Sequence, residues 1–220
     1  MHINKKFQYP ILNRVTLSDQ RYYETLSGEK LTSVTTILSK TKDDTFLKEW
    51  RERIGNEEAD RQIKYASSLG TIFHEHLENF VQDIPRPNGS SIIYKQAEKM
   101  SDQVIKNGLI YLDEVWGLEE MLYYPELYAG TCDLIGVYKD KPSIIDYKTT
   151  KKMKDDKKIK DYKLQLCAYA MSHNFLFGTD INQGVILMCS RDNEFQEFIV
   201  DLDEYMPEWL DKLELFYDKK

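Results

Sequence analysis

The sequence predicts an α/β fold in which a sheet is flanked by helices. Two patterns support this prediction. Apolar residues recur at helical spacing through much of the first 116 residues, and after Gly117 the chain changes to short runs rich in aromatic and β-branched residues. With 220 residues, the chain is long enough to bury one hydrophobic core. We therefore expect a single domain, with a mainly helical part over 1–116 and a sheet core over 117–220.

In the first part, a β-hairpin is expected to turn at Ser27-Gly28 and to be followed by helices. The segment 82–91 carries Pro, Gly and Ser and predicts a loop. Apolar spacing predicts helices in three stretches, which are 34–54, a segment that begins near Gly70, and about 92–115.

In the second part, strands and helices alternate. The pattern of aromatic and β-branched residues predicts a meander of strands over 119–124, 129–138, 143–148, 184–190 and 194–200. Helices are expected over about 160–175 and at the end of the chain, through Met206, Trp209 and Phe216. The Lys-rich run 151–160 is expected to be a loop.

Composition excludes several classes of protein. No apolar run approaches the roughly 20 residues that span a bilayer, and the first ten residues do not resemble a secretory signal. Three cysteines without a C-x-x-C pair disfavour a disulfide framework, and an iron–sulfur cluster usually needs four thiolates. We therefore expect a cytoplasmic chain with no iron–sulfur cluster and no membrane partner.

The charge is distributed unevenly along the chain. The net charge is -7, yet residues 139–163 hold ten Lys and five Asp. Such an arrangement predicts a basic stretch on an acidic body, and a basic stretch attracts polyanions.

A second hairpin places charged residues together. If residues 130–150 turn at Lys139-Asp140, Asp133 lies directly opposite Asp146, with Cβ atoms about 5 Å apart. Lys148 shares the face of Asp146, because side chains alternate along a strand. Opposed carboxylates repel unless a cation lies between them, and a divalent metal with open coordination positions supports phosphodiester hydrolysis. The alternative is that both carboxylates are solvated and Lys148 is their ion-pair partner.

Three further polar residues have two interpretations each. Gln165 and Tyr169 lie four residues apart on one predicted helix face, where they either support the site or are ordinary surface positions. His74 either belongs to the site or pairs with Glu78 at i, i+4. The zinc-protease pattern H-E-x-x-H is excluded, because the position of the second histidine holds Glu78.

The ordered set Gly70-x-x-x-His74-x-x-x-Glu78, Gly130-x-x-Asp133, Asp146-x-Lys148 and Gln165-x-x-x-Tyr169 resembles the PD-(D/E)xK nuclease superfamily, in particular its RecB-like branch. Ser33-Val34-Thr35-Thr36-Ile37-Leu38, with Leu47-Lys48-Glu49-Trp50-Arg51 after it, is similar to the mitochondrial genome maintenance exonuclease family and its phage and bacterial relatives. The resemblance covers about residues 31 to 218. Cys132 replaces the proline of the superfamily name, and the Cys quartet of iron–sulfur members is missing.

The resemblance implies a nuclease core with a central mixed sheet flanked by helices, and roles for individual residues. His74, Asp133, Asp146 and the carbonyl of Tyr147 would be ligands of Mg²⁺ or Mn²⁺. The catalytic group would comprise Asp133, Asp146, Lys148 and Gln165. DNA contacts would come from the hydroxyls of Ser33, Thr35, Thr149 and Tyr169, and from Lys151 and Lys152 of the basic stretch. Glu126, close before Asp133, is expected to assist.

The implied function is a metal-dependent exonuclease that acts on single-stranded DNA or flaps in replication, repair or recombination, as a monomer whose helical N-terminal part guides the DNA. Trp50, Tyr65 and Phe73 are candidates for base stacking, although core packing is the favoured interpretation for most of them. Three alternatives remain: a duplex-resecting exonuclease or structure-specific endonuclease, a DNA-binding module without catalysis, and a structural subunit of a replication or recombination assembly.

Overall fold

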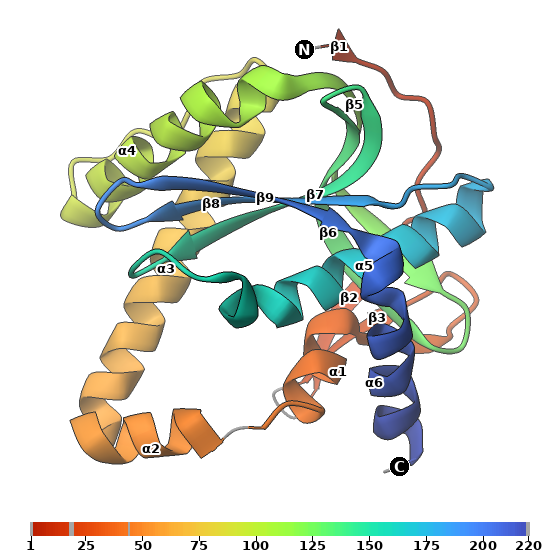
Figure 1. Cartoon of the computed structure of the whole chain (residues 1–220), viewed down its shortest axis with the longest axis horizontal. Helices are drawn as coiled ribbons and strands as arrows, with labels where there is room; N and C mark the ends of the chain where they lie inside the picture. The colour runs from red at the N-terminus through yellow and green to blue at the C-terminus, as the bar shows by residue number, and fades with distance from the viewer. Residues whose placement is uncertain (1, 18–19, 44, 219–220) are drawn as a thin grey trace.

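A computed structural model describes residues 2–17, 20–43 and 45–218. Its centre is a mixed sheet with helices on both faces, which confirms the predicted fold class (Figure 1). The strands are β1 (His2–Ile3), β2 (Asn13–Leu17), β3 (Gln20–Glu24), β4 (Lys30–Ser33), β5 (Leu112–Tyr124), β6 (Tyr128–Tyr138), β7 (Lys141–Thr150), β8 (Gln183–Ser190) and β9 (Phe195–Asp201). The helices are α1 (Val34–Lys40), α2 (Thr45–Ile54), α3 (Asn56–Val81), α4 (Ile92–Asn107), α5 (Lys160–Phe177) and α6 (Met206–Asp218).

The strand order is β2-β3-β4-β6-β7-β8-β9, and β5 pairs with both β6 and β1. The pairs β4–β6, β7–β8 and β1–β5 are parallel and the others antiparallel. The simple meander expected from the sequence is therefore wrong. The chain crosses from β7 to β8 through α5, and a crossover helix returns the chain so that the two strands run in parallel.

The helices form one layer on each face of the sheet. On one face, α1, α5 and α6 pack on strand residues that include Ile135, Ile144 and Ile186. On the other face, α3 and α4 pack on Leu134, Ile145 and their neighbours. Figure 1 shows α4 on one side of the sheet and α5 and α6 on the other. The alternation of apolar residues along β6 and β7 is thus explained by two cores, one on each face.

Two hairpins of the sheet agree with the sequence. Around Ser27-Gly28, β3 pairs with β4 in antiparallel register. The β6–β7 hairpin turns at Lys139-Asp140, both with positive φ of 50° and 64°, which is the conformation of a two-residue type I′ turn. The pair Leu134–Ile145 has the expected register.

The N-terminal half differs from the prediction in three respects. Its first strands belong to the sheet, because β4 pairs with Tyr128 and Ala129 of β6. The part that was expected to be mainly helical therefore also contributes strands. The helix predicted over 92–115 ends at Asn107, where Gly108 ends α4, and the chain has entered β5 by Leu112. The apolar stripe 34–54 forms two helices, α1 and α2, rather than one.

None of the helices in the described part of the chain is both long enough and apolar enough to cross a bilayer.

Candidate active site

The candidate site lies where β4 and β7 diverge from β6. On one edge of β6, β4 pairs with residues 128–129 and β7 pairs with residues 134–138. Residues 130–133 lie between these two pairings. Beyond Ile145, β7 continues beside β8 alone. At this fork, residues 130–133 and the end of β7 lack the neighbouring strand that a continuous ladder would supply. The predicted Asp133 and Asp146 both lie here.

Asp133 lies at an irregularity that β5 and β6 share. Cys132 packs in the core beneath α5, whereas Leu134, two positions later, packs in the core beneath α3 and α4. Regular alternation would place both on one face, so the strand slips by one position at Asp133. On β5, Glu119 has a positive φ of 52° at the matching position. The slip turns Asp133 toward α3.

Asp133 contacts groups from α3 and β7. Its Oδ2 accepts a hydrogen bond from the backbone N–H of Tyr147 at 2.8 Å and lies 3.6 Å from His74 Nδ1. The hydrogen bond from the Tyr147 N–H takes the place of a strand-to-strand backbone hydrogen bond at the fork. The second brings together two of the predicted metal ligands, and it disfavours the alternative in which His74 pairs with Glu78.

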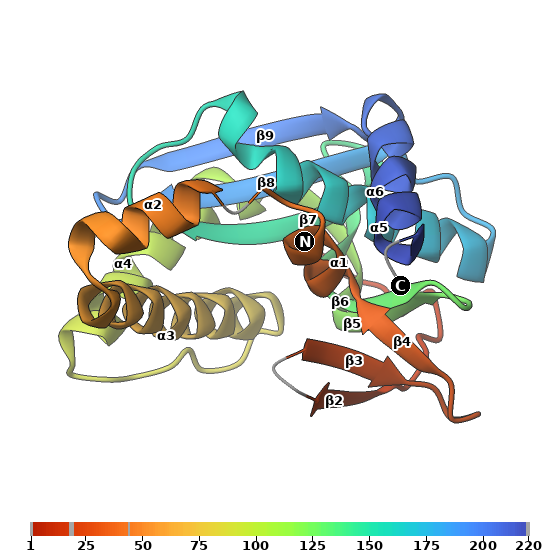
Figure 2. The ribbon, with the colours of Figure 1, turned by 90° about the horizontal axis from the view of Figure 1, so that it is seen from below.

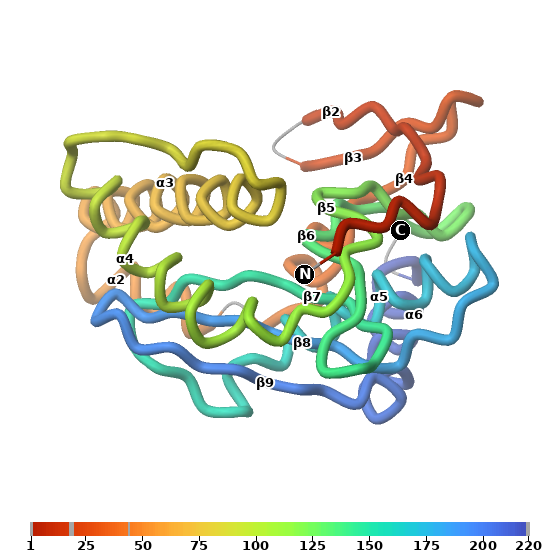
Figure 3. The backbone as a smooth tube through the Cα atoms, turned by 90° about the horizontal axis from the view of Figure 1, so that it is seen from above, coloured from red at the N-terminus to blue at the C-terminus, as the bar shows by residue number. Residues whose placement is uncertain are grey.

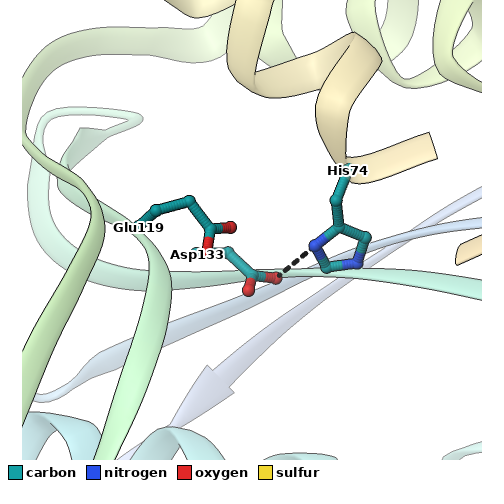
Figure 4. Close-up of side chains that lie close together, drawn as sticks. All are labelled: His74, Glu119 and Asp133. Carbon is teal, nitrogen blue, oxygen red and sulfur yellow. Dashed lines mark ion pairs between the residues drawn. The ribbon is translucent and has the colours of Figure 1, made fainter. Parts of the chain in front are cut away.

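Glu119 is a site residue that the sequence did not indicate. Its carboxylate, that of Asp133 and the His74 ring offer ligand atoms that all lie within 4.8 Å of one another, in a group suited to a metal ion. Figure 4 shows the three side chains converging from α3 and from two strands. Burial and then the charge of Asp133 raise the pKa of Glu119 to about 8. A cation between these groups would oppose both effects.

Asp146 and Lys148 form an ion pair beside this group. The Asp146 side chain is only 2% exposed. Burial raises the pKa of Asp146 and the charge of Asp133 adds to this effect, while Lys148 opposes it. Burial disfavours the charge of Lys148, but Asp146 and Asp133 outweigh it and raise the pKa of the amine. Among the described residues, Asp146 Oδ1 has no hydrogen-bond donor.

A chain of side chains leads from Lys148 to α5. Lys148 Nζ donates to Gln165 Oε1 at 3.3 Å, and Gln165 Nε2 donates to the Tyr169 hydroxyl at 3.2 Å. Tyr169 in turn packs on Gly130, where an added Cβ would lie 2.7 Å from the Tyr169 ring. The structure thus brings together Gly130, Lys148, Gln165 and Tyr169, and it explains the glycine by close packing.

All of these groups except Asp146 and Lys148 border a cavity of about 660 Å³ between α3 and the β2–β3 hairpin. Figures 2 and 3 show α3 and this hairpin on either side of β5 and β6. His74, Glu119, Asp133, Gln165 and Tyr169 line the cavity, together with Ser33 and Thr35. Ser33 also begins α1, because its hydroxyl accepts a hydrogen bond from the Thr36 N–H at 3.1 Å. Thr35 is exposed to the cavity.

A second cavity, of about 380 Å³, contains Thr149 and Lys151, with Lys154 and Arg191. Ala66 of α3 lines both cavities, so they adjoin along that helix. Lys152 is exposed and lines neither cavity.

The basic stretch is partly neutralised. Lys158, Lys160 and Lys163 form ion pairs with Asp155, Glu208 and Asp156 at 2.9, 2.7 and 2.6 Å. Lys163 is itself buried. The free positive charge beside the site is therefore smaller than the sequence count suggests.

Some of the remaining candidates lie away from the catalytic groups. Glu126 is exposed in the β5–β6 turn, where its backbone N–H bonds to Glu29, and Glu119 occupies the place near Asp133. Phe73 is fully buried in the core, as favoured. Trp50 lines the second cavity, and the Arg191 guanidinium lies 4.8 Å from the centre of the Tyr65 ring.

The chain is similar in sequence to known exonucleases. No family model matches the chain. The chain is 28% identical over 212 residues to mitochondrial genome maintenance exonuclease 1 of Homo sapiens and 27% identical over 215 residues to that of Xenopus tropicalis. Each alignment covers 89% of this chain, and the chain spans 60% of the length of each of these relatives.

A likeness in fold accompanies the similarity in sequence. The crystal structure of a candidate exonuclease from Eubacterium rectale matches 70% of this chain and 65% of its own, with a TM-score of 0.50 and 13% identity. At that identity the likeness concerns the fold alone. The relatives in sequence confirm the resemblance that the motifs predicted: the chain is similar to the mitochondrial genome maintenance exonucleases, and its fold is similar to that of a candidate exonuclease.

Proposed function

We propose that this protein is a divalent-metal-dependent deoxyribonuclease that removes nucleotides from a free end of single-stranded DNA or of a flap, in replication, repair or recombination. The observation that carries the proposal is the convergence of His74, Glu119 and Asp133 beside the Asp146–Lys148 pair at one cavity. The names of the relatives in sequence support the same activity.

The residues present fit a hard divalent cation. Buried carboxylates that face one another without a cation are costly, and Asp146 Oδ1 is buried without a donor among the described residues. Carboxylate and carbonyl oxygens, which make up most of this group, suit Mg²⁺ or Mn²⁺. We propose Asp133, Asp146, His74 and the Tyr147 carbonyl as ligands, and we add Glu119 to this set.

The bound metal would lower the pKa of a coordinated water and neutralise charge on the phosphate. Lys148 would place its ammonium group beside the phosphate and stabilise the charge that develops on the phosphate oxygens. Gln165, fixed by its hydrogen bonds with Lys148 and Tyr169, would orient the attacking water. Tyr169 acts through Gln165 and also borders the cavity that would hold the strand.

The cavity supports a single strand as substrate. It is walled by α3 on one side and by the β2–β3 hairpin on the other, and it adjoins the second cavity along α3. We propose that the N-terminal part guides the strand past the sheet core, with the Ser33 and Thr35 hydroxyls at one cavity and Thr149, Lys151 and the neighbouring Lys152 at the other. We propose that the protein acts as a monomer.

The test uses linear single-stranded DNA labelled at its 5′ or 3′ end, a closed single-stranded circle and a blunt duplex, each with and without Mg²⁺ or Mn²⁺. The wild type is compared with Lys148→Ala and with Lys141→Ala, which removes an exposed lysine at the far end of the same strand. We expect metal-dependent shortening of the linear single strand by the wild type and by Lys141→Ala only.

Other results would change the assignment. Cleavage of the circle would indicate an endonuclease, and faster digestion of the duplex would indicate a resecting exonuclease. If none of the substrates is cut with either metal, the proposed activity is wrong and a DNA-binding role becomes the better hypothesis.

A further inference from the structure

Two arginines of the β2–β3 hairpin face the catalytic groups across the cavity. Arg14 pairs in register with Tyr23, and Thr16 pairs with Arg21. Side chains of paired residues and of residues two apart share a face, so Arg14 and Arg21 lie on the face that carries Tyr23. All three side chains line the main cavity.

The hairpin is anchored to the site. The Tyr23 side chain is buried, and its hydroxyl lies 3.1 Å from Thr131 Oγ1, two residues before Asp133. β3 also pairs with β4, whose last residue is Ser33. The two arginines therefore stand on strands that belong to the same sheet as the catalytic groups.

Both guanidinium groups are available for a ligand. Arg14 and Arg21 are exposed, and no ion pair or hydrogen bond engages either side chain within residues 2–17, 20–43 and 45–218. This contrasts with the basic stretch, where Lys158, Lys160 and Lys163 are all paired. An unpaired arginine facing a cavity can present its planar fork of donors to an incoming group.

The cavity separates groups of opposite charge. We call Glu75, Glu78, Glu119 and Asp133 the acidic wall, and Arg14 and Arg21 the basic wall. The charge of Arg14 acts on Glu119 across this space, although burial and Asp133 have larger effects on the pKa of that carboxyl. The walls do not form ion pairs with each other in the described structure, so the space between them is open to a third, anionic group.

We propose that Arg14 and Arg21 form a phosphate-binding subsite that holds the backbone of the DNA strand opposite the catalytic acids. Arginine binds phosphate oxygens with two parallel charge-assisted hydrogen bonds. The two side chains are diagonal neighbours across the hairpin, with Cβ atoms about 7 to 8 Å apart, so they can hold one phosphate or two successive ones. The proposal rests on the proposed function, because it assigns a substrate contact to that same site.

The experiment measures binding of a short, fluorescently labelled single-stranded DNA by anisotropy, in a metal chelator, over about 50 to 200 mM salt. The variant is Arg14→Gln with Arg21→Gln. Its matched control is Lys106→Gln with Lys141→Gln, which removes the same charge from exposed residues that line none of the cavities described above. Thermal unfolding of both variants checks the fold.

We expect the arginine variant to bind DNA about tenfold more weakly or worse, because each charge-assisted hydrogen bond is lost. The slope of log affinity against log salt should fall by about 0.7 for each phosphate contact removed, or about 1.4 for two contacts. The control should change neither quantity by more than about twofold. Arg14→Lys with Arg21→Lys should keep most of the slope, because the charge remains, and lose part of the affinity.

Two results would overturn the subsite: equal affinity and slope for the arginine variant and the lysine control, or no salt-dependent DNA binding by the wild type. Cleavage is measured in parallel, so the two proposals can fail separately. A wild type that binds with the expected slope but never cleaves supports the subsite and refutes the nuclease. If the wild type cleaves DNA and the arginine variant keeps the salt slope of the wild type, the nuclease proposal is supported and the subsite is refuted.

Discussion

The acidic wall and the basic wall of the main cavity are built in different ways. Two residues of the acidic wall, Glu119 and Asp133, are held by the backbone of the sheet. Glu119 and Asp133 lie at a slip in two paired strands, and Asp133 is fixed by the Tyr147 backbone. The basic wall consists of two exposed side chains on a short hairpin. Groups that perform chemistry need fixed positions, whereas groups that hold a flexible strand gain from adjustable ones.

The largest expected effect separates Lys148, which lies beside the acidic wall, from the basic wall by the kinetic parameter that each one changes. Lys148→Ala should lower kcat by about a hundredfold to a thousandfold or more, because a donor to the developing charge is lost, and should leave the Kd for DNA within about twofold. Arg14→Gln with Arg21→Gln should instead raise KM and leave kcat nearly unchanged. Single-turnover and steady-state cleavage assays measure both quantities. A kcat unaffected by Lys148→Ala would remove this residue from the transition state.

The second prediction concerns metal binding to the acidic wall. Saturation with Mn²⁺ at about 100 times its Kd should stabilise the wild type by about 2.7 kcal/mol, or roughly 5 to 10 °C in Tm. Asp133→Asn and Glu119→Gln should lose most of this gain, because each removes a charged ligand. Asp140→Asn, in the turn of the same hairpin, is the matched control and should keep the gain. If Glu119→Gln behaves like the control, Glu119 is not a ligand.

The third prediction uses a buried histidine that belongs to neither wall. Burial, together with the charge of Lys6, lowers the pKa of His173 to about 4. The unfolded chain, with a pKa near 6.5, therefore binds more protons between about pH 4 and 6.5, so stability falls as the pH decreases through this window. The contribution of His173 to this loss between pH 7 and 5 is about 2 kcal/mol, and it is measured as the difference between the wild type and His173→Gln, because Glu119 acts in the opposite direction.

Urea unfolding at each pH measures this loss. His173→Gln should remove this contribution, whereas His2→Gln, at an exposed residue, should leave it intact. A pH dependence that is the same in His173→Gln and in the wild type would assign the effect to other groups. The acidic wall is not among them, because the raised pKa of Glu119 makes the folded state more stable as the pH falls.

The smallest expected effect compares two glycines that border the main cavity. Gly130→Ala would place a Cβ 2.7 Å from the buried Tyr169 ring and should cost about 1 to 2 kcal/mol of unfolding free energy, with a displaced Gln165. Gly70→Ala would meet only Thr149 Oγ1 at 3.9 Å, and it should stabilise α3 by up to about 1 kcal/mol. Thermal unfolding of the two variants gives the comparison. Equal stabilities would show that Tyr169 moves freely.

Much of the sheet followed from local patterns. The β6–β7 register was predictable because two short-range facts determine it, namely the turn at Lys139-Asp140 and the alternation of the flanking residues. The same reasoning applied to the β5–β6 hairpin would have found Glu119. Tyr124 pairs with Tyr128, and this register places Glu119 opposite Asp133.

Other features had no local signal. Arg14 and Arg21 are ordinary exposed strand residues in the sequence, and they acquire a role only because the β2–β3 hairpin faces α3 (Figure 2). The Lys-rich stretch looked like free positive charge, yet its ion pairs reach Glu208 of α6 as well as nearby acids. The end of α4 did have a local signal in Gly108, but the close packing of this glycine on β8, where an added Cβ would lie 3.1 Å from the Leu187 side chain, had none.

The sequence by itself determined the α/β class, the hairpin that brings Asp133 near Asp146 and Lys148, and the helix that carries Gln165 and Tyr169. These features depend on periodicity and turns, which act over a few residues. Only the tertiary structure decided that His74 reaches Asp133 and that two arginines face the acidic wall. Those contacts join segments about 60 to 120 residues apart, and their positions are set by how the helices and the β2–β3 hairpin pack on the sheet.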